Sequence, residues 1–236
     1  MRPYFFTLCV VGLLFCIGCD RLPGKPTTAD IELKPQAVRD FATLYRQNCS
    51  GCHGPEGKGN GAIALNNPIY LAIAPDGVLR HTTSLGVPGT MMPAFLKSAG
   101  GTLTEEQIEI LVSGMRARWS KPEELRGAVP PSYVAETPGD AQNGAMVYGA
   151  FCSSCHGADG KGSQKAGSIV DSSYLALVSD QGLRTLIIAG RPDLHHPDWR
   201  NYLPGHAMTA QEVTDSVAWL ASKRVANPGQ PYAKRE

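Results

Sequence analysis

The sequence predicts a mainly α-helical protein that consists of two similar helical domains in tandem, joined by a proline-rich linker. The first observation is an internal repeat, because the segment GPEGKG at residues 54–59 returns as GADGKG at residues 157–162. The second is the helical spacing of apolar residues in both halves, each of which ends in a helix that opens with a capping box. The length of 236 residues allows two such domains.

Residues 1–18 are expected to be a signal peptide of the lipoprotein type. Their apolar run is too short for a comfortable membrane span, and a small residue precedes the cleavage point. Gly18 and Cys19 resemble a lipobox, whose cysteine becomes the lipidated first residue, and Asp20 resembles a signal for retention at the inner membrane. Ordinary cleavage and an uncleaved anchor are the alternatives. We therefore expect a location on the bacterial periplasmic side, anchored to the cell membrane through Cys19.

Residues 19–36 are polar and contain three prolines, so we expect a tether between the lipid and the first domain. The chain has 22 basic and 21 acidic residues, and loss of Arg2 with the signal peptide leaves a formal charge of zero. This balance predicts neither a nucleic-acid partner nor a strongly steered one.

The first domain is predicted over residues 37–119. Its first helix has an apolar stripe formed by Val38, Phe41, Leu44 and Tyr45. A glycine-rich loop, short helices near residues 67–72 and 77–84, and a second irregular loop at residues 86–95 follow. Thr104 and Gln107 then form the capping box of the last helix. The buried stripe of that helix is expected to comprise Ile108, Leu111, Val112 and Met115.

Residues 120–138 contain four prolines and are expected to form a semi-rigid linker. The second domain is predicted over residues 139–225, followed by a C-terminal tail at residues 226–236. Thr209 and Glu212 form its capping box. The repeat offset places Met208 opposite Leu103, which pairs with Ile108 as a hydrophobic staple.

Two C-x-x-C-H motifs are the strongest chemical signal in the chain, and this pattern is read as a c-type haem attachment site. They comprise Cys49, Cys52 and His53 in the first domain, and Cys152, Cys155 and His156 in the second. Two thiols on one helical turn can add to the two vinyl groups of a haem, and the following histidine then lies beneath the iron. A redox dithiol or half of a zinc site is the alternative for each motif, but two copies in a repeat favour two covalently bound haem c groups.

The cysteine count agrees with export and haem attachment. The chain has seven cysteines. Cys9 and Cys16 belong to the expected signal peptide, Cys19 is assigned to lipid, and the other four are assigned to haem. No cysteine is then left for a disulfide, a thiolate iron ligand or a nucleophile.

The chain resembles two tandem class I cytochrome c domains. The likeness rests on an entry helix that leads into C-x-x-C-H, a loop with methionine before proline, and a last helix that crosses the first. Members of this family commonly carry a glycine and an aromatic residue before the first haem cysteine, and Gly144 and Tyr148 fit that pattern. Tyr45 also fits, but Phe41 stands where glycine is usual. The resemblance therefore leaves the close helix crossing open in the first domain.

The resemblance implies that Met92, which precedes Pro93, is the sixth ligand of the first haem iron. Met91 is the neighbouring alternative, and a buried methionine can also simply fill a core.

In the second domain the repeat offset places His196 where the first domain has Met92, so we expect His196 to be the sixth ligand. Met208 is the main rival, His195 and His206 are further candidates, and an open site is a last alternative. Imidazole donates more strongly than a thioether and favours ferric iron. We therefore expect the lower potential at the second haem, and electron transfer from the second haem to the first.

Arg80 and Arg184 occupy matched positions in the two domains. A guanidinium suits carboxylates, so both are candidates for contacts with haem propionates. The alternative for each is a solvated helix arginine.

Two functions of different classes follow. The first is a membrane-tethered dihaem electron carrier that works between a respiratory donor complex and a terminal acceptor, with a redox protein on each side. The second is a dihaem redox enzyme, peroxidase-like or acting on small sulfur species, that reacts at a displaceable position of the second haem. A haem-based sensor or a fixed subunit of a larger complex differs from the carrier only in its partners.

Overall fold

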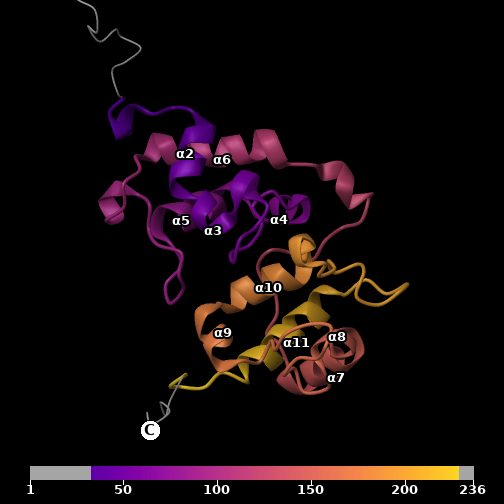
Figure 1. Ribbon diagram of the computed structural model, residues 1–236. Helices are drawn as coiled ribbons and strands as arrows, with labels where there is room; N and C mark the ends of the chain where they lie inside the picture. The colour runs from indigo at the N-terminus through magenta and orange to yellow at the C-terminus, as the bar shows by residue number, and fades with distance from the viewer. Residues whose placement is uncertain (1–32, 229–236) are drawn as a thin grey trace, which may run out of the picture. The chain divides into compact units, whose positions relative to one another are not determined.

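The computed structural model describes residues 33–228, and this part of the chain is helical, with isolated β-bridges and no strand (Figure 1). This confirms the mainly α-helical prediction. Its contacts group the described residues from Arg39 onward into one compact unit. Within residues 33–228, no helix is both long and apolar enough to cross a membrane. The expected signal peptide and Cys19, the expected lipidation site, lie outside the described residues.

The first half of the described chain contains five α-helices, of which α3 carries part of the haem motif, together with short 3-10 turns (Figure 1). Asp40 caps the helix that begins at Phe41 by accepting a hydrogen bond from the backbone N–H of Thr43, and Asn67 caps the helix that begins at Pro68. The predicted capping box at Thr104 is present. In chain order the elements are η2 (Pro35–Ala37), α2 (Phe41–Asn48), α3 (Ser50–His53), η3 (Pro55–Gly57), α4 (Pro68–Ile73), α5 (Asp76–Leu85), η4 (Lys97–Ala99) and α6 (Glu105–Trp119).

The second half repeats this order of helices after the linker. The capping box at Thr209 is present, as predicted. Asp140, Asp171 and Ser179 cap, through their side chains, the helices that begin at the next residue in each case. The elements are η5 (Pro122–Leu125), α7 (Ala141–Phe151), α8 (Ser153–His156), α9 (Ser172–Leu177), α10 (Asp180–Ala189), η6 (Pro192–Leu194) and α11 (Ala210–Ala221).

The predicted elements agree with the structure except at the first helix. The stripe was expected to start at Val38, but α2 begins at Phe41 because Asp40 takes the capping position. The expected stripe of α6 is buried throughout, as is the staple residue Leu103. Its counterpart Met208 is buried in the same way, at 2% exposure.

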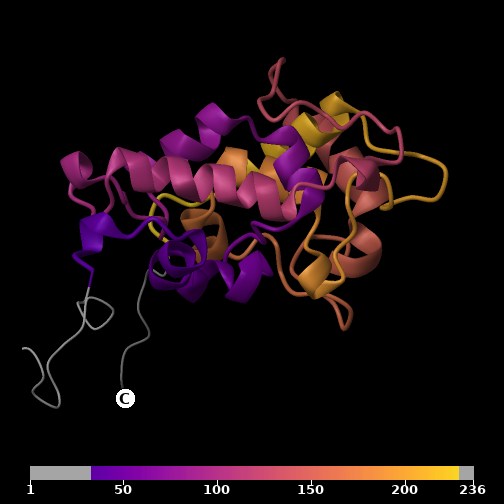
Figure 2. The ribbon, with the colours of Figure 1, turned by 90° about the horizontal axis from the view of Figure 1, so that it is seen from above.

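The crossing of α2 and α6 in the first half uses a glycine on the last helix. Figures 1 and 2 show α6 as the long helix that runs across this half. Phe41 of α2 packs directly on Gly114, where an added Cβ atom would lie 2.1 Å from Cδ2 of the ring. The missing glycine of the entry helix is therefore replaced by a glycine on its partner, and the close crossing is kept.

The crossing of α7 and α11 in the second half has the opposite arrangement. Here the glycine is on the entry helix, because an added Cβ atom at Gly144 would lie 2.0 Å from the backbone oxygen of Asp215 and 2.8 Å from Cβ of Trp219. The repeat offset makes Gly144 the counterpart of Phe41, and Trp219 the counterpart of Gly114. In the first half the last helix therefore carries the glycine and the entry helix the large side chain, and in the second half the arrangement is reversed.

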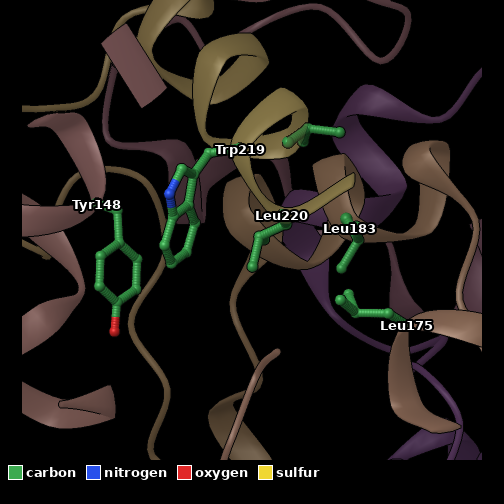
Figure 3. Close-up of a cluster of buried hydrophobic side chains, with 6 residues drawn as sticks. Tyr148, Leu175, Leu183, Trp219 and Leu220 are labelled. Atoms are coloured by element: carbon green, nitrogen blue, oxygen red, sulfur yellow. The ribbon is translucent and has the colours of Figure 1, made fainter. Parts of the chain in front are cut away.

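The core of the second half surrounds the space beside its C-x-x-C-H turn. Tyr148 and Trp219 stack with ring centroids 4.1 Å apart, and Leu183 and Leu175 lie on the other side of Leu220 (Figure 3). The cluster joins residues from α7, α9, α10 and α11. The walls of this space are mostly apolar.

Two arginines of the second half bind the proline-rich linker, one near its start and one in its middle. The guanidinium of Arg184 donates to the carbonyl oxygens of Ser132 and Tyr133, at 3.0 and 3.1 Å. Arg200 donates to the carbonyl oxygens of Glu124 and Leu125, at 3.1 and 3.2 Å. The linker therefore lies along the compact unit instead of acting as a free spacer.

Two candidate haem sites

The first C-x-x-C-H motif forms a tight turn at the end of the entry helix. Cys49 ends α2, and Cys52 and His53 lie on the single turn of α3. Cys49 is half-buried and Cys52 is exposed, which leaves one thiol inside and one at the surface. His53 is buried, and its Nδ1 lies 2.8 Å from the carbonyl oxygen of Ile63. This contact fixes the ring and leaves Nε2 free to bind a metal.

The second motif has the same construction. Cys152 ends α7, and Cys155 and His156 lie on α8. The Nδ1 atom of His156 lies 2.8 Å from the carbonyl oxygen of Gly167, so its Nε2 is also free. In both motifs burial raises the pKa of the inner thiol to about 12, at Cys49 and at Cys152. These thiols stay protonated at neutral pH until they react.

In each domain, the loop predicted to carry the sixth ligand passes close to the glycine that ends the preceding helix. Gly86 ends α5 with φ +71°, and an added Cβ atom would lie 2.5 Å from the carbonyl oxygen of Met92. Gly190 ends α10 with φ +68°, and there the same atom would lie 2.7 Å from the carbonyl oxygen of His196. Glycine is required at both positions, because positive φ and the close approach both exclude a side chain. The structure therefore brings Met92 and His196 to equivalent places.

In the first site the two methionines differ in exposure. Met91 is 77% exposed, whereas Met92 is half-buried. The backbone N–H of Met92 donates to the hydroxyl of Thr90, and its carbonyl oxygen accepts from Val87. These contacts fold the loop back on itself at Met92.

In the second site His196 faces His156 across a pocket. Tyr148, Leu183, Tyr202 and Trp219 also line this pocket. The ring centroids of His156 and His196 are 6.2 Å apart. A histidine nitrogen binds its metal at about 2 Å, so two rings on opposite sides of one ion have centroids roughly 6 Å apart. The residues present thus fit a haem iron held between two imidazoles.

The electrostatics of His196 suit a neutral ligand. Burial, together with the neighbouring His156, lowers the pKa of His196 to about 4. Its Nδ1 is buried and has no hydrogen-bond partner within the described part of the chain. The ring therefore differs from both proximal histidines, whose Nδ1 atoms contact backbone carbonyls.

The rival ligands lie away from this pocket. Met208 is buried, and its backbone N–H donates to the carbonyl oxygen of Trp199, as that of Leu103 donates to Phe95. This places Met208 at the staple position. His195 is exposed and in the left-handed region, and His206 contacts Glu212 at 3.1 Å.

The matched arginines have different surroundings. Arg80 lies on the surface and forms an ion pair with Glu109, with Nε and Oε2 2.5 Å apart. Arg184 is only 3% exposed, and besides its linker contacts it donates to the hydroxyl of Thr214 at 2.9 Å. The propionate contacts stay a prediction for both residues. Residues 33–228 contain no group of three or more His, Cys, Asp or Glu that could by itself hold a metal ion.

Sequence reasoning missed two residues that shape these sites. Gly114 carried a signal, because a glycine inside a helix pattern often marks a close approach. Arg200 carried no such signal, since its linker contacts span 75 and 76 positions of sequence.

The fold and the two motifs define c-type cytochrome domains, and comparison with known proteins agrees. A family profile described as "Cytochrome C oxidase, cbb3-type, subunit III" matches residues 36–113, and one described as "Cytochrome c" matches residues 141–224. The chain belongs to the c-type cytochromes, with two cytochrome c domains in tandem. The two motifs imply two covalently bound haem c groups.

Two curated relatives are cbb3-type cytochrome c oxidase subunits. The subunit FixP of Sinorhizobium medicae is 30% identical over 151 residues, which are 59% of this chain and 46% of the relative. The subunit CcoP of Rubrivivax gelatinosus is 29% identical over 163 residues, 68% of this chain and 48% of the relative. The chain thus spans about half the length of the curated relatives it matches.

Among solved structures, a reducing HAO-like protein complex of Kuenenia stuttgartiensis gives a TM-score of 0.43 with 19% identity. The match covers 83% of this chain and 100% of the chain in the solved structure. At this TM-score the likeness supports no conclusion about function.

Proposed function

We propose that the protein is a membrane-tethered dihaem cytochrome that carries single electrons between a respiratory donor complex and a terminal acceptor. Its relatives are named as subunits of a cbb3-type cytochrome c oxidase, which supports a terminal oxidase as the acceptor. The tether is a lipid on Cys19, and the haem domains face the bacterial periplasm. The donor is a redox protein or complex on the same side of the membrane.

Four residues would hold the two irons along their axes. They are His53 and Met92 in the first domain, and His156 and His196 in the second. The iron of each bound haem supplies the one-electron chemistry, and the protein sets its potential through the axial ligands. The two histidine–carbonyl contacts orient the proximal rings, and the apolar walls exclude water from the pocket of the second domain.

The observation that carries this proposal is the difference between the two sixth-ligand positions. Met92 and His196 occupy equivalent places over Gly86 and Gly190, but one offers a thioether and the other an imidazole. A thioether raises the potential of haem iron relative to an imidazole. With haem bound at both sites, this difference would favour electron transfer from the second haem to the first.

Near-infrared magnetic circular dichroism of the oxidised protein tests the ligand sets, and a potentiometric titration tests the direction. We expect one methionine–histidine signature and one bis-histidine signature, with the lower potential at the bis-histidine haem. H196M is expected to replace the bis-histidine signature by a second methionine–histidine signature. It is expected to raise the potential of the second haem only. Two methionine–histidine signatures in the wild type contradict His196 as a ligand.

The tether is tested separately by substitution of Cys19. C19S is expected to release the haem-containing protein from the membrane fraction, whereas C9S is expected to leave it there, because only Cys19 would carry the lipid. Mass spectrometry of the mature N-terminus is the direct measurement. A wild-type protein whose mature N-terminus carries no lipid contradicts lipid anchoring.

A second candidate function is a redox enzyme that reacts at the second haem. The observation that favours it is the unpartnered Nδ1 of His196, because a metal-bound histidine usually donates that N–H to a partner that holds it in place. An enzyme of this kind is expected to consume peroxide after partial reduction, whereas a carrier is not. Peroxide turnover that is lost in H196M would favour the enzyme.

A further inference from the structure

Arg200 lies four positions after His196 and contacts both its own loop and the start of the linker. Its Nε and Nη2 atoms donate to the carboxylate of Asp198, at 3.0 and 2.8 Å. Its Nη1 donates to the carbonyl oxygens of Glu124 and Leu125 in η5. Its guanidinium also lies 4.8 Å from the ring centroid of Trp199. One side chain thus connects the sixth-ligand loop to the start of the linker.

These contacts are specific to the second domain. The repeat offset places Ala94 of the first domain opposite Asp198, and Leu96 opposite Arg200. The first domain therefore has neither the acid nor the base at these positions. The surrounding backbone is similar in the two loops. The carbonyl oxygen of Trp199 accepts a hydrogen bond from the N–H of Met208, and that of Phe95 accepts one from the N–H of Leu103.

The second domain has a particular need for such contacts, because the buried Nδ1 atom of His196 has no hydrogen-bond partner within the described residues. Its position depends on the backbone that carries it. On one side, Arg191 and His196 exchange two backbone hydrogen bonds of 3.1 and 3.0 Å. On the other side, the chain continues to Asp198 and Trp199, and Arg200 holds both.

We propose that Arg200 is a positioning residue for His196, which clamps the sixth-ligand loop of the second haem to the linker. The inference rests on the proposed role of His196 as an iron ligand. An arginine suits this task because its planar fork can donate to a carboxylate and to two carbonyls at once. The Arg200 and Asp198 side chains are 22% and 13% exposed, so water screens their ion pair only in part.

Loss of the clamp loosens the loop near Asp198, where the backbone hydrogen bonds of Trp199 with Ile188 and Met208 remain, and lets His196 leave the iron more often. Truncation at Arg200 leaves the carbonyl oxygens of Glu124 and Leu125 without these donors, and Asp198 without its cation. The loop keeps its backbone bridge at Arg191. The ligand is therefore expected to exchange faster without loss of the domain fold.

The experiment compares R200A, R200K and R224A with the wild-type dihaem protein. R224A is the matched control, because Arg224 also binds two carbonyl oxygens, of Leu175 and Val178, and pairs with Asp180, but at the α9–α10 junction. The readout is the rate at which cyanide abolishes the bis-histidine near-infrared band of the ferric protein. Hydrogen exchange of the amides in residues 191–208 is the second readout.

R200A is expected to bind cyanide at the second haem about tenfold faster, which equals about 1.4 kcal/mol, and to lose protection in residues 191–208. R200K keeps the charge but not the fork, so its rate is expected between those of R200A and the wild type. R224A is expected to stay within about twofold of the wild type, the usual scatter of independent sites.

The outcomes separate this inference from the proposed function. A wild-type protein without a bis-histidine band overturns both. A wild-type protein with that band, and R200A at the wild-type cyanide rate, overturns the inference about Arg200 alone. Equal acceleration in R224A also overturns it, since the effect is then a general loss of stability. If R200A does not accumulate as a dihaem protein, R200K decides, and a wild-type rate in R200K overturns the inference.

Discussion

Replacement of Gly114 by alanine tests whether the crossing of α2 and α6 depends on the exchange of small and large residues between helices. A Cβ atom at Gly114 would lie 2.1 Å from Cδ2 of Phe41 and 2.5 Å from Cγ, far inside van der Waals contact. Phe41 is 9% exposed, so its ring has little room to move away. We therefore expect G114A to destabilise the first domain through steric conflict.

The magnitude follows from two opposing terms. Alanine favours a helix interior over glycine by about 0.8–1.0 kcal/mol, whereas overpacking of a core costs about 1–3 kcal/mol. G114A should therefore lower the free energy of unfolding by about 0–2 kcal/mol, the difference of these ranges. F41A alone should lower it by about 3–5 kcal/mol. In the F41A background the obstacle is absent, so G114A should instead stabilise by about 1 kcal/mol.

Hydrogen exchange of the full dihaem protein measures this change of sign. Opening free energies of amides in α2 and α6 report the first domain separately, so the chain need not unfold as one unit. G144A is the matched control in the second domain, where the obstacle is the backbone oxygen of Asp215 and truncation of Trp219 gives no full relief. The reasoning is refuted if G114A destabilises α2 and α6 equally with and without the Phe41 ring.

M92A is expected to open the first haem site to cyanide and M91A is not, because Met91 is 77% exposed; equal cyanide binding by both variants would contradict Met92 as the ligand. D215N is expected to destabilise the second domain by about 1–3 kcal/mol, measured by hydrogen exchange of α7 and α11. Burial raises the pKa of Asp215, but hydrogen bonds from the Asp140 N–H and from Asn143 and Gln211 outweigh it and hold the pKa below its ordinary value. The stabilisation by Asp215 is therefore fully present above the ordinary carboxyl pKa and is lost as the pH falls through the lowered pKa of Asp215. A stability difference between wild type and D215N that stays constant as the pH falls through this range would contradict the reasoning.

Much of the fold could be predicted because its signals are local. Helix caps and apolar stripes depend on residues a few positions apart, and both predicted capping boxes are present. The first helix begins three residues later than its stripe suggested, because the cap at Asp40 decides where the backbone turns helical. The repeat offset also placed Met208 at the staple position and His196 in the loop over Gly190, where the structure has them.

Contacts between distant segments could not be predicted in the same way. The prolines of residues 120–138 predicted a semi-rigid spacer, which is what composition alone implies. Arg184 and Arg200 bind that segment through backbone carbonyls, and every residue type offers a carbonyl oxygen. The segment therefore carries no side-chain pattern that names its partners.

The two halves also show why a repeat predicts backbone contacts better than the residues that make them. The guanidinium of Arg116 binds the carbonyl oxygens of Leu71 and Ala74, and that of Arg224 binds those of Leu175 and Val178. The carbonyls correspond at the repeat offset of 104 positions, but the two arginines are 108 positions apart. A long side chain can reach one helix end from more than one turn, so only the contact has to be kept. The exchange at the helix crossings follows the same logic, because a close approach needs one small residue and either helix can supply it.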